Sequence, residues 1–470
     1  MGIGGSLAVP GWAADADWPQ FRGPQGRSIG MGKTPPLEFS GGSNLVWEAA
    51  VGAGNSSPIV FGGRVFLTSY EGQKLRTSAW ELESGRALWT AEVQPDSLEP
   101  AHRLASPAVP TAVTDGRRVV VDFGSYGLVA YDPNGAKLWE RRLPKPVVEF
   151  GASSSPLLFE GRVYLNCDQD LGSYLTALDA ATGRELWRVE RAEFRRGFAT
   201  PFLWESSPKH WELVVPGSLR LVSYDPGSGR ELWTVRGTSR VACSSPTSGD
   251  GLLFTASWNV GGDAGSRIEM PTWEAFAPQN DANHDGLLSA SEIPAGPVRE
   301  RFTQMDLNKD GLVTPVEWNE MAGMFAKAEN ALLAIRPGGR GEITQTHVAW
   351  KATRSLPYVA SPLYYEGRLY TVRSGGMATA YEASTGRVLY QDERLGALGD
   401  YYASPVAAAG RVYFLSQAGR VTVLRAGDRF EVLSRGDLGD EVTATPALSD
   451  GRFLVRLSGG KLKVFGEKRP

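Results

Sequence analysis

Two segments of twelve residues carry the residue types that bind a divalent cation. In residues 281–292, oxygen-bearing side chains occupy the first, third and fifth positions, a glycine the sixth and a glutamate the twelfth, and residues 306–317 repeat this pattern. A calcium loop needs hard oxygen donors at this spacing, a sharp turn at the glycine and a carboxylate that binds through both oxygens. The sequence therefore predicts two Ca²⁺ ions, with the ligands Asp281, Asn283, Asp285, Leu287 (backbone carbonyl), Ser289, Glu292, Asp306, Asn308, Asp310, Leu312 (backbone carbonyl), Thr314 and Glu317.

The residues around these loops indicate how the loops are held. Leu288 and Val313 occupy position 8 of each loop, where we expect them to pair as a short two-stranded bridge. Each terminal glutamate stands at capping-box spacing from Ser289 or Thr314, and is expected to open a helix. Residues 316–328 predict the longer of these helices. We expect its apolar stripe to pack onto the rest of the protein, with the members Trp318, Met321, Met324 and Phe325.

The alternative for both segments is an acidic linker rich in turns. Residues 281–320 contain eight acidic and three basic side chains, in a chain whose total net charge is −3. The acidity is thus concentrated where two divalent cations would neutralise it. The remaining chain has no basic stripe, which argues against a nucleic-acid partner.

A repeated unit of about 45 residues makes up most of the chain around these loops. Each copy begins with a Ser-Pro or Thr-Pro step, continues with short apolar runs separated by turns, and in most copies ends in an aromatic residue. Four short strands per copy predict an all-β fold, an eight-bladed β-propeller. The copies begin at Pro58, Pro107, Pro156, Pro201, Pro246, Pro362, Pro405 and Pro446, and the aromatic ends are Trp89, Trp139, Trp187, Trp233, Trp350 and Tyr390.

The eighth copy has no outer strand of its own after residue 465. Residues 45–49, Leu-Val-Trp-Glu-Ala, can supply that strand from the other end of the chain. We therefore predict that the N-terminal strand completes the last blade, which leaves no open sheet edge.

The long interval between Pro246 and Pro362 contains the calcium loops. The insertion falls between the second and third strands of the fifth copy, so it lies on the face that also carries the links between blades. Those links bring polar residues to one mouth of the propeller axis, where they could bind a polar ligand or a protein segment; solvated loops are the alternative interpretation. The candidate residues are His102, Arg103, Glu149, Arg196, Arg240, Tyr358, Asp400, Tyr401 and Glu441, with Tyr402 and Asp440 beside them.

The chain divides into five predicted parts. Residues 1–16 resemble the tail of an export signal, because Ala14-Asp15-Ala16 has the small-x-small cleavage pattern, although a plain disordered terminus is the alternative. An N-terminal arm follows, whose aromatics we expect to pin it to the propeller surface. We expect Cys167 and Cys243 to remain unpaired, because they lie in copies that are not neighbours. The further boundaries are 17–43 for the arm, 44–258 for blades 1–4 and the start of blade 5, 259–329 for the insertion, and 330–470 for the remainder.

The Ser-Pro starts, the Ala-Leu-Asp-Ala-Ala-Thr-Gly type of turn and the Leu-Trp ends resemble those of the pyrroloquinoline-quinone-like propeller family. The insertion resembles a paired EF-hand. One branch of that family comprises quinoprotein dehydrogenases, which hold the quinone and a calcium ion at the axis, and another comprises binding propellers without the cofactor, such as the outer-membrane barrel assembly lipoprotein. In the dehydrogenases the resemblance implies carboxylate and Asn ligands for calcium, a general base and often an adjacent Cys pair. This chain has no adjacent Cys pair, and its mouth carboxylates match no ligand motif of the family.

The sequence thus favours a periplasmic or secreted, calcium-binding propeller that acts as a non-catalytic scaffold. Its expected partner is a protein or a polar small molecule at the mouth, and we expect a monomer with no membrane span. No catalytic residue can be assigned. The alternatives are a quinone-dependent oxidoreductase, for which the site residues give no support, and a calcium-responsive switch.

Overall fold

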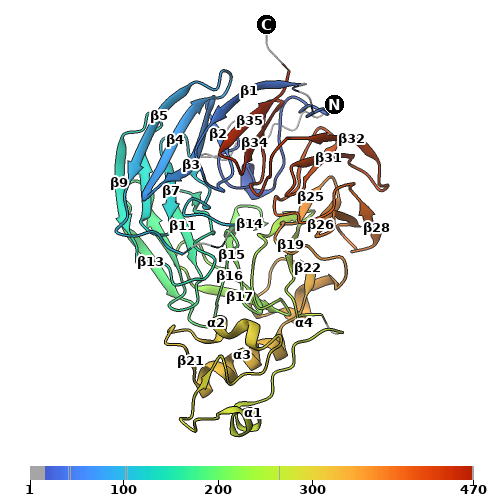
Figure 1. Cartoon of the computed structure of the whole chain (residues 1–470). Coiled ribbons are helices and arrows are strands. Elements are labelled where there is room, and N and C mark those ends of the chain that lie inside the picture. Colours follow the sequence, from blue (N-terminus) through green and yellow to red (C-terminus); the bar gives the residue numbers. More distant parts are fainter. Residues whose placement is uncertain are drawn as a thin grey trace.

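Eight antiparallel sheets stand in a ring in the computed structural model of the protein, which confirms the predicted eight-bladed propeller (Figure 1). The structure describes residues 16–467 except residues 41, 43, 101, 103 and 264. The expected export signal lies outside these residues, apart from Ala16. No helix in the described ranges is long and apolar enough to cross a membrane.

Blades 1 to 4 follow one another directly in the sequence, and each keeps its strands in chain order. Their hydrophobic strands are short because turns interrupt the chain every few residues. The strands are β2 (Ile59–Phe61), β3 (Arg64–Glu71), β4 (Lys74–Glu81), β5 (Ala87–Val93), β6 (Val113–Thr114), β7 (Val119–Phe123), β8 (Gly127–Tyr131), β9 (Lys137–Arg142), β10 (Leu157–Phe159), β11 (Arg162–Cys167), β12 (Tyr174–Asp179), β13 (Glu185–Glu190), β14 (Phe202–Ser207), β15 (His210–Gly217), β16 (Arg220–Tyr224) and β17 (Glu231–Arg236).

Blades 5 to 8 complete the ring, and blade 5 is interrupted by the insertion between its second and third strands. A short strand from blade 5, β23 (Gly341–Glu342), also pairs in parallel with β17 and ties blade 5 to blade 4. The remaining strands are β18 (Thr247–Gly249), β19 (Leu252–Ser257), β22 (Ala331–Ile335), β24 (Val348–Ala352), β25 (Leu363–Tyr365), β26 (Arg368–Arg373), β27 (Met377–Glu382), β28 (Val388–Arg394), β29 (Val406–Ala408), β30 (Arg411–Leu415), β31 (Arg420–Arg425), β32 (Val432–Asp437), β33 (Ala447–Ser449), β34 (Arg452–Leu457), β35 (Lys461–Phe465) and β1 (Leu45–Ala50).

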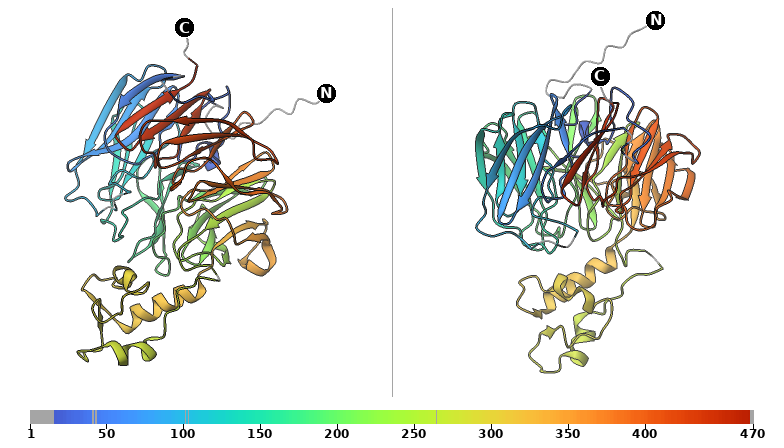
Figure 2. Two further views of the ribbon diagram at one scale, coloured as in Figure 1. Left: turned by 45° about the vertical axis from the view of Figure 1, so that its right-hand side comes forward. Right: turned by 45° about the horizontal axis from the view of Figure 1, so that its top comes forward.

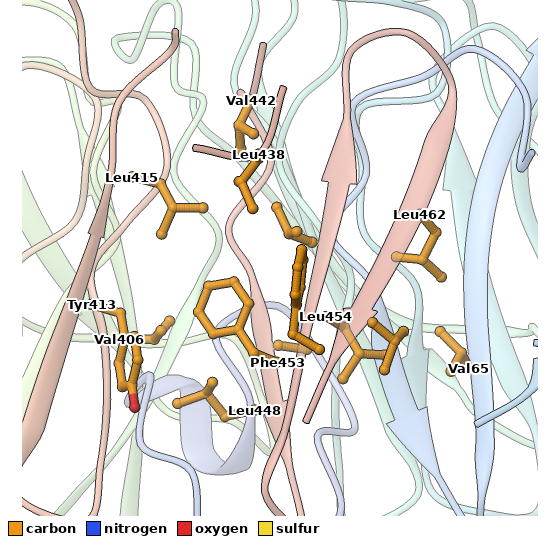
Figure 3. Packing of buried hydrophobic residues seen from close by; sticks show 14 of the residues in the cluster. Val65, Val406, Tyr413, Leu415, Leu438, Val442, Leu448, Phe453, Leu454 and Leu462 are labelled. Carbon is orange, nitrogen blue, oxygen red and sulfur yellow. The ribbon is translucent and has the colours of Figure 1, made fainter. Parts of the chain in front are cut away.

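The N-terminal strand closes the ring as predicted. Strand β1 pairs antiparallel with β35, and Trp47 lies opposite Val464. The core of blade 8 then fills the space between blades 7 and 1: Figure 3 shows Phe453 and Leu454 of β34 between Tyr413 of blade 7 and Val65 of blade 1. The rings of Phe453 and Tyr413 lie 5.5 Å apart. Strand β1, from the opposite end of the chain, thus covers the edge of β35 and forms the outer strand of blade 8.

Blade 2 begins later than the sequence pattern predicts. The hydroxyl of Thr111 accepts a hydrogen bond from the backbone N–H of Ser57 at 3.0 Å. In blade 3, the same kind of bond is accepted by Ser155, the residue before the repeat proline. Ala112 therefore takes the place of the repeat proline, and Pro107 lies in the link before it. The prediction was wrong because the link contains a Ser-Pro step of its own.

The outer-strand tryptophan of one blade packs onto the turn glycine of the next blade. Trp139 donates its indole N–H to the carbonyl of Ala180 at 2.9 Å, and its ring covers Gly183, whose φ is 71°. A glycine is required there because a Cβ would lie 2.6 Å from the ring. The same contact joins four other blade pairs, including the closing strand: Trp47–Gly85, Trp89–Gly135, Trp187–Gly229 and Trp350–Gly386.

The substitution Gly183→Ala is expected to lower the free energy of unfolding by about 3 kcal/mol, because it adds a ring clash to the cost of a positive φ. The matched control is Gly161→Ala, since Gly161 has a φ of 73° and no atom near its Cβ position. That control should cost only about 1 kcal/mol. Urea unfolding of both variants measures the difference, and equal losses would show that the ring contact contributes nothing.

The insertion forms a helical body that projects from one face of the propeller (Figure 2). Leu288 and Val313 pair as predicted, and the short helices pack around a shared apolar core. Its elements are α1 (Trp273–Asn280), β20 (Leu288–Ser289), η2 (Arg299–Arg301), α2 (Phe302–Met305), β21 (Leu312–Val313) and α3 (Pro315–Lys327).

Two details of the insertion differ from the prediction. The apolar stripe of α3 does not pack mainly on the propeller: Trp318, Met321 and Phe325 are buried in the insertion's own core, with Leu288 and Met305. No helix follows Glu292 directly, because prolines and a glycine occupy the next turns. The capping box at Thr314 and Glu317, by contrast, is present at the start of α3.

Candidate functional site

A cavity of about 540 Å³ lies on the propeller axis, and every blade contributes to its wall. Seven of the wall hydroxyls accept a backbone N–H from the preceding blade; the bond from Thr111 to Ser155 measures 2.9 Å, and that from Ser404 to Thr445 measures 3.0 Å. These bonds fix the inner strands and line the cavity with neutral oxygen atoms. The ring consists of Ser57, Thr111, Ser155, Thr200, Ser245, Ser361, Ser404 and Thr445.

Two arginines bring positive charge to the mouth of this cavity. Arg196 is neutralised, because it forms ion pairs with Glu149 at 2.7 Å and with Asp170 at 2.6 Å. Arg240 forms no ion pair with any described carboxylate; it donates to the side-chain oxygen of Gln304 at 2.9 Å, and its Nε–H has no partner among the described residues. Burial, together with the nearby positive charges, lowers the pKa of Arg240 to about 10, so it stays charged at neutral pH.

Aromatic and aliphatic side chains form much of the remaining wall. The imidazole of His102 lies 5.0 Å from the ring of Phe150, and Phe150 meets Phe198 edge-on at 5.9 Å. Leu104, Val109, Val241 and Val359 also line the cavity. No Asp or Glu side chain is among the described residues of this wall. The cavity is therefore suited to a ligand with an apolar body rather than to a cation.

The structure brings together only part of the predicted mouth. His102, Arg196, Arg240 and Tyr358 line the cavity, and Glu149 reaches it through its ion pair with Arg196. Asp400, Tyr401 and Glu441 do not belong to the wall. Asp400 accepts a hydrogen bond from Tyr402, which does line the cavity, Tyr401 is buried under its own link, and Glu441 is exposed to solvent. Arg103 lies outside the described residues.

Several wall residues were not singled out from the sequence. The residues of the hydroxyl ring are, in most copies, the Ser or Thr that precedes the repeat proline. The proline alone was taken to mark the start of a copy, and no role was predicted for the hydroxyl. Phe150 and Phe198 precede inner strands in the same way as the charged candidates. Gln304 carries no signal, because its position depends on how the insertion folds back.

The N-terminal arm closes the other end of the cavity instead of lying on the propeller surface, as the sequence had suggested. Trp18 pairs with Val60 through two backbone hydrogen bonds and is fully buried. Phe21 lines the cavity wall, and the helical turn η1 (Pro24–Gly26) packs beside β14. The arm is thus a plug inside the ring.

Arg22 anchors this plug. Its guanidinium donates to the carbonyls of Pro246 at 2.8 Å and Pro362 at 2.6 Å, to that of Ser245 at 3.2 Å, and to the hydroxyl of Ser28 at 2.9 Å. Burial without a carboxylate partner lowers the pKa of Arg22 to about 9. The side chain therefore joins blades 5 and 6 through neutral acceptors.

The second candidate calcium loop is held by hydrogen bonds to its terminal carboxylates. Asp306 accepts the N–H of Gly311 at 3.0 Å, and Glu317 accepts the N–H groups of Leu307 and Thr314 at 2.9 Å each. These bonds bring position 12 back over position 1, as a cation-binding loop requires.

The first loop repeats the arrangement. Asp281 accepts the N–H of Gly286 at 3.0 Å, and Glu292 accepts those of Ala282 at 3.0 Å and Ser289 at 2.8 Å. No group of three or more His, Cys, Asp or Glu side chains converges to metal-binding distance within the described ranges. Calcium binding by the two loops therefore remains a prediction.

Two side chains of the insertion contact Arg240 at the mouth of the axial cavity, and a third contacts the link before blade 4. Besides the hydrogen bond from Arg240 to Gln304, the ring of Phe325 in α3 lies 5.3 Å from the Arg240 guanidinium. Glu320, also in α3, forms an ion pair with Arg195 of the link before blade 4. The insertion is thus fixed beside the axis, as its place between β19 and β22 predicts.

Two buried carboxyl groups lie between blades 2 and 3, outside the axial cavity. Burial, and to a smaller extent the neighbouring Asp122, raises the pKa of Glu99 to about 8, and burial raises the pKa of Asp122 to about 7. One oxygen of each carboxyl has no hydrogen-bond partner among the described residues. Both carboxyl groups are therefore expected to be largely protonated in mildly acidic solution.

These groups predict that the protein loses stability as the pH rises from about 5 to about 8. The native state binds more protons than the unfolded chain in this window, so the free energy of unfolding falls with rising pH, by on the order of 5 kcal/mol. The neutral variant Glu99→Gln should flatten this slope, whereas Glu190→Gln at an exposed position should not. Urea unfolding across the pH range measures both, and an unchanged slope in Glu99→Gln would contradict the assignment.

The protein is thus an eight-bladed propeller with a ligand-sized axial cavity. The family model described as "Outer membrane protein assembly factor BamB" matches residues 37–169, 171–270 and 301–456. The chain therefore belongs to this family. No curated protein matches the sequence.

Solved structures with the same fold come from both branches of propellers. BamB from Moraxella catarrhalis is 14% identical, with a TM-score of 0.58, over 91% of this chain and 98% of that one. Quinohemoprotein alcohol dehydrogenase from Comamonas testosteroni is 13% identical, with a TM-score of 0.54, over 97% and 82% of the two chains. A europium-containing methanol dehydrogenase is 12% identical, with a TM-score of 0.53, over 97% and 98%. At these identities the similarity concerns the fold alone.

Proposed function

We propose that the protein is a non-catalytic binding scaffold of the cell envelope, or a secreted one, whose insertion binds two calcium ions. The observation that carries the proposal is the wall of the axial cavity, which offers hydroxyl, aromatic and arginine side chains but no carboxylate among its described residues. A propeller mouth of this composition can hold a polar ligand or a protein segment. The family of outer membrane assembly factors supports a binding role and a place in the envelope.

The residues do not fit the quinone-dependent alternative. A quinone site of the resembling dehydrogenases needs carboxylate ligands for an axial calcium ion and a carboxylate general base, and the described cavity wall has neither. Cys167 and Cys243 are both free and lie in different blades, and burial raises the pKa of Cys243 to about 12. A redox pair of adjacent cysteines is therefore also missing from the described chain.

Titration of the metal-stripped protein with pyrroloquinoline quinone, with and without added calcium, tests the non-catalytic part of the proposal. We expect no saturable quinone binding by absorbance or calorimetry. Binding of one quinone per chain would overturn this part and would direct the search to alcohols and sugars as substrates.

A photo-crosslinking residue tests the binding part. It is placed at Leu398, which is 76% exposed in the link between blades 6 and 7, and at Val388, which is 44% exposed on the outer strand β28, as the control. In cells, Leu398 should give a discrete adduct that Val388 does not give. The same adducts from both positions would contradict a binding surface at the mouth.

The contacts between the insertion and Arg240 favour a second candidate, the calcium-responsive switch. If calcium orders the second loop, it also orders α2 and α3, which hold Gln304 and Phe325 against the mouth. Loops of this type saturate the ion with protein oxygens, and extracellular calcium keeps even weak sites occupied. We therefore propose a structural role for the ions first, and regulation second.

A further inference from the structure

We propose that the axial cavity binds a small monocarboxylate with an apolar or aromatic body, and that Arg240 is the residue that pairs with the carboxylate. This inference rests on the proposed role of the mouth as the binding site, and it names the chemical class of the ligand. It follows from the charge, the burial and the walls of the cavity.

The two arginines of the described cavity wall differ in their charge partners. Arg196 already has two carboxylate partners, Glu149 and Asp170. Arg240 has none among the described residues, although it is nine-tenths buried. A buried guanidinium without a counter-ion is costly, because burial removes the water that solvates its charge. Among the described lining residues, Arg240 is thus the arginine whose positive charge has no carboxylate partner, and one such charge matches a monoanion.

The guanidinium of Arg240 has donors that the described residues do not use. The Nη1 group of Arg240 donates to the side-chain oxygen of Gln304. The Nε–H of Arg240 has no partner among the described residues. The centroid of the Phe325 ring lies 5.3 Å from the guanidinium carbon of Arg240. A carboxylate can accept two N–H groups from one guanidinium, whereas a neutral ligand leaves the charge unpaired.

The size and wall of the cavity define the rest of the ligand. A volume of about 540 Å³ lies within the range of small-molecule sites. The apolar wall residues include Phe150, Phe198, Val241 and Val359, and ring hydroxyls such as those of Ser155 and Thr200 already accept backbone N–H groups. Such a wall suits an apolar or aromatic body better than a strongly hydrated dianion such as phosphate.

The experiment is calorimetric titration of the full chain with benzoate, with benzyl alcohol as the neutral analogue and inorganic phosphate as the second anion. Benzoate should bind once per chain, and benzyl alcohol at least about tenfold more weakly, because a good charge-assisted pair contributes a factor of this size. The variant Arg240→Gln should weaken benzoate binding at least about tenfold. Arg236→Gln, at an exposed position paired with Glu342, is the matched control and should change nothing.

A second variant keeps the test valid if Arg240→Gln fails to fold. Gln304→Glu places a carboxylate where the Gln304 oxygen now lies, 2.9 Å from the guanidinium, and should reduce benzoate affinity at least about tenfold by occupying Arg240 internally. Unchanged benzoate binding in a folded variant of either kind would overturn the proposal, as would equal binding of benzyl alcohol. Binding of phosphate without benzoate would overturn the ligand class. Calcium binding and the Leu398 adduct do not depend on these results, so their failure would instead count against the proposed function.

Discussion

In calcium, the double variant Glu292→Ala/Glu317→Ala is expected to lose the folded insertion at a temperature at which the wild-type insertion is intact. Each substitution removes the carboxylate that would bind an ion through two oxygens. An ion present at about 100 times its dissociation constant stabilises the folded state by about 2.7 kcal/mol, so two sites account for about 5 kcal/mol. Because the insertion has its own core, the propeller should keep its β-sheet circular dichroism.

Hydrogen exchange of α1 and α3, measured with and without a chelator, reports this loss directly. The matched control is Glu274→Ala/Glu300→Ala, which removes the same charge from the insertion at positions outside both loops. The control should keep its protection in calcium. Equal loss of protection in both variants would show that charge, and not calcium ligation, is responsible. Global unfolding of the first variant would show that the insertion is part of the propeller core.

Removing the side chain of Arg22 is the second large effect that the structure predicts. The variant Arg22→Ala leaves three buried carbonyl groups, those of Ser245, Pro246 and Pro362, without their donor, and it empties the centre of the plug. Unsatisfied buried acceptors cost about 1–3 kcal/mol each, and water entering from the cavity offsets part of this cost. The free energy of unfolding should fall by about 3 kcal/mol.

Urea unfolding measures this effect against two controls. Arg86→Ala removes an exposed arginine paired with Glu81 and should cost less than about 0.5 kcal/mol. Arg22→Lys keeps the charge but lacks the planar fork that reaches two blades, so it should recover only part of the loss. A loss in Arg22→Ala no larger than that in Arg86→Ala would contradict the role of the arm as a plug.

The repeat pattern was sufficient to predict the propeller and its closure, because a period of four short strands allows few other folds. It failed at blade 2, where Pro107 offers a second Ser-Pro step and Ala112 takes the structural position. It also failed for the arm and for the stripe of α3. Both contain aromatic residues that must be buried somewhere, and the sequence does not say against which surface.

The sequence predicted only part of the candidate site, because it does not show which way each side chain points. A residue in a link between blades lies on the face of the propeller that carries the cavity mouth. This reasoning correctly predicted that His102, Arg196, Arg240 and Tyr358 line the cavity. It does not give the direction of the side chain, and Tyr401 is buried where Tyr402 faces the cavity. The sequence also does not show which arginine the neighbouring carboxylates pair with. In the structure Glu149 and Asp170 both pair with Arg196, which leaves Arg240 without an ion pair among the described residues.

Calcium binding by the two loops is measured by calorimetric titration of the metal-stripped protein with calcium. We expect two calcium ions bound per chain, and none in the variant Glu292→Ala/Glu317→Ala. The absence of binding in the wild-type protein, or binding that survives the double substitution, would contradict this expectation.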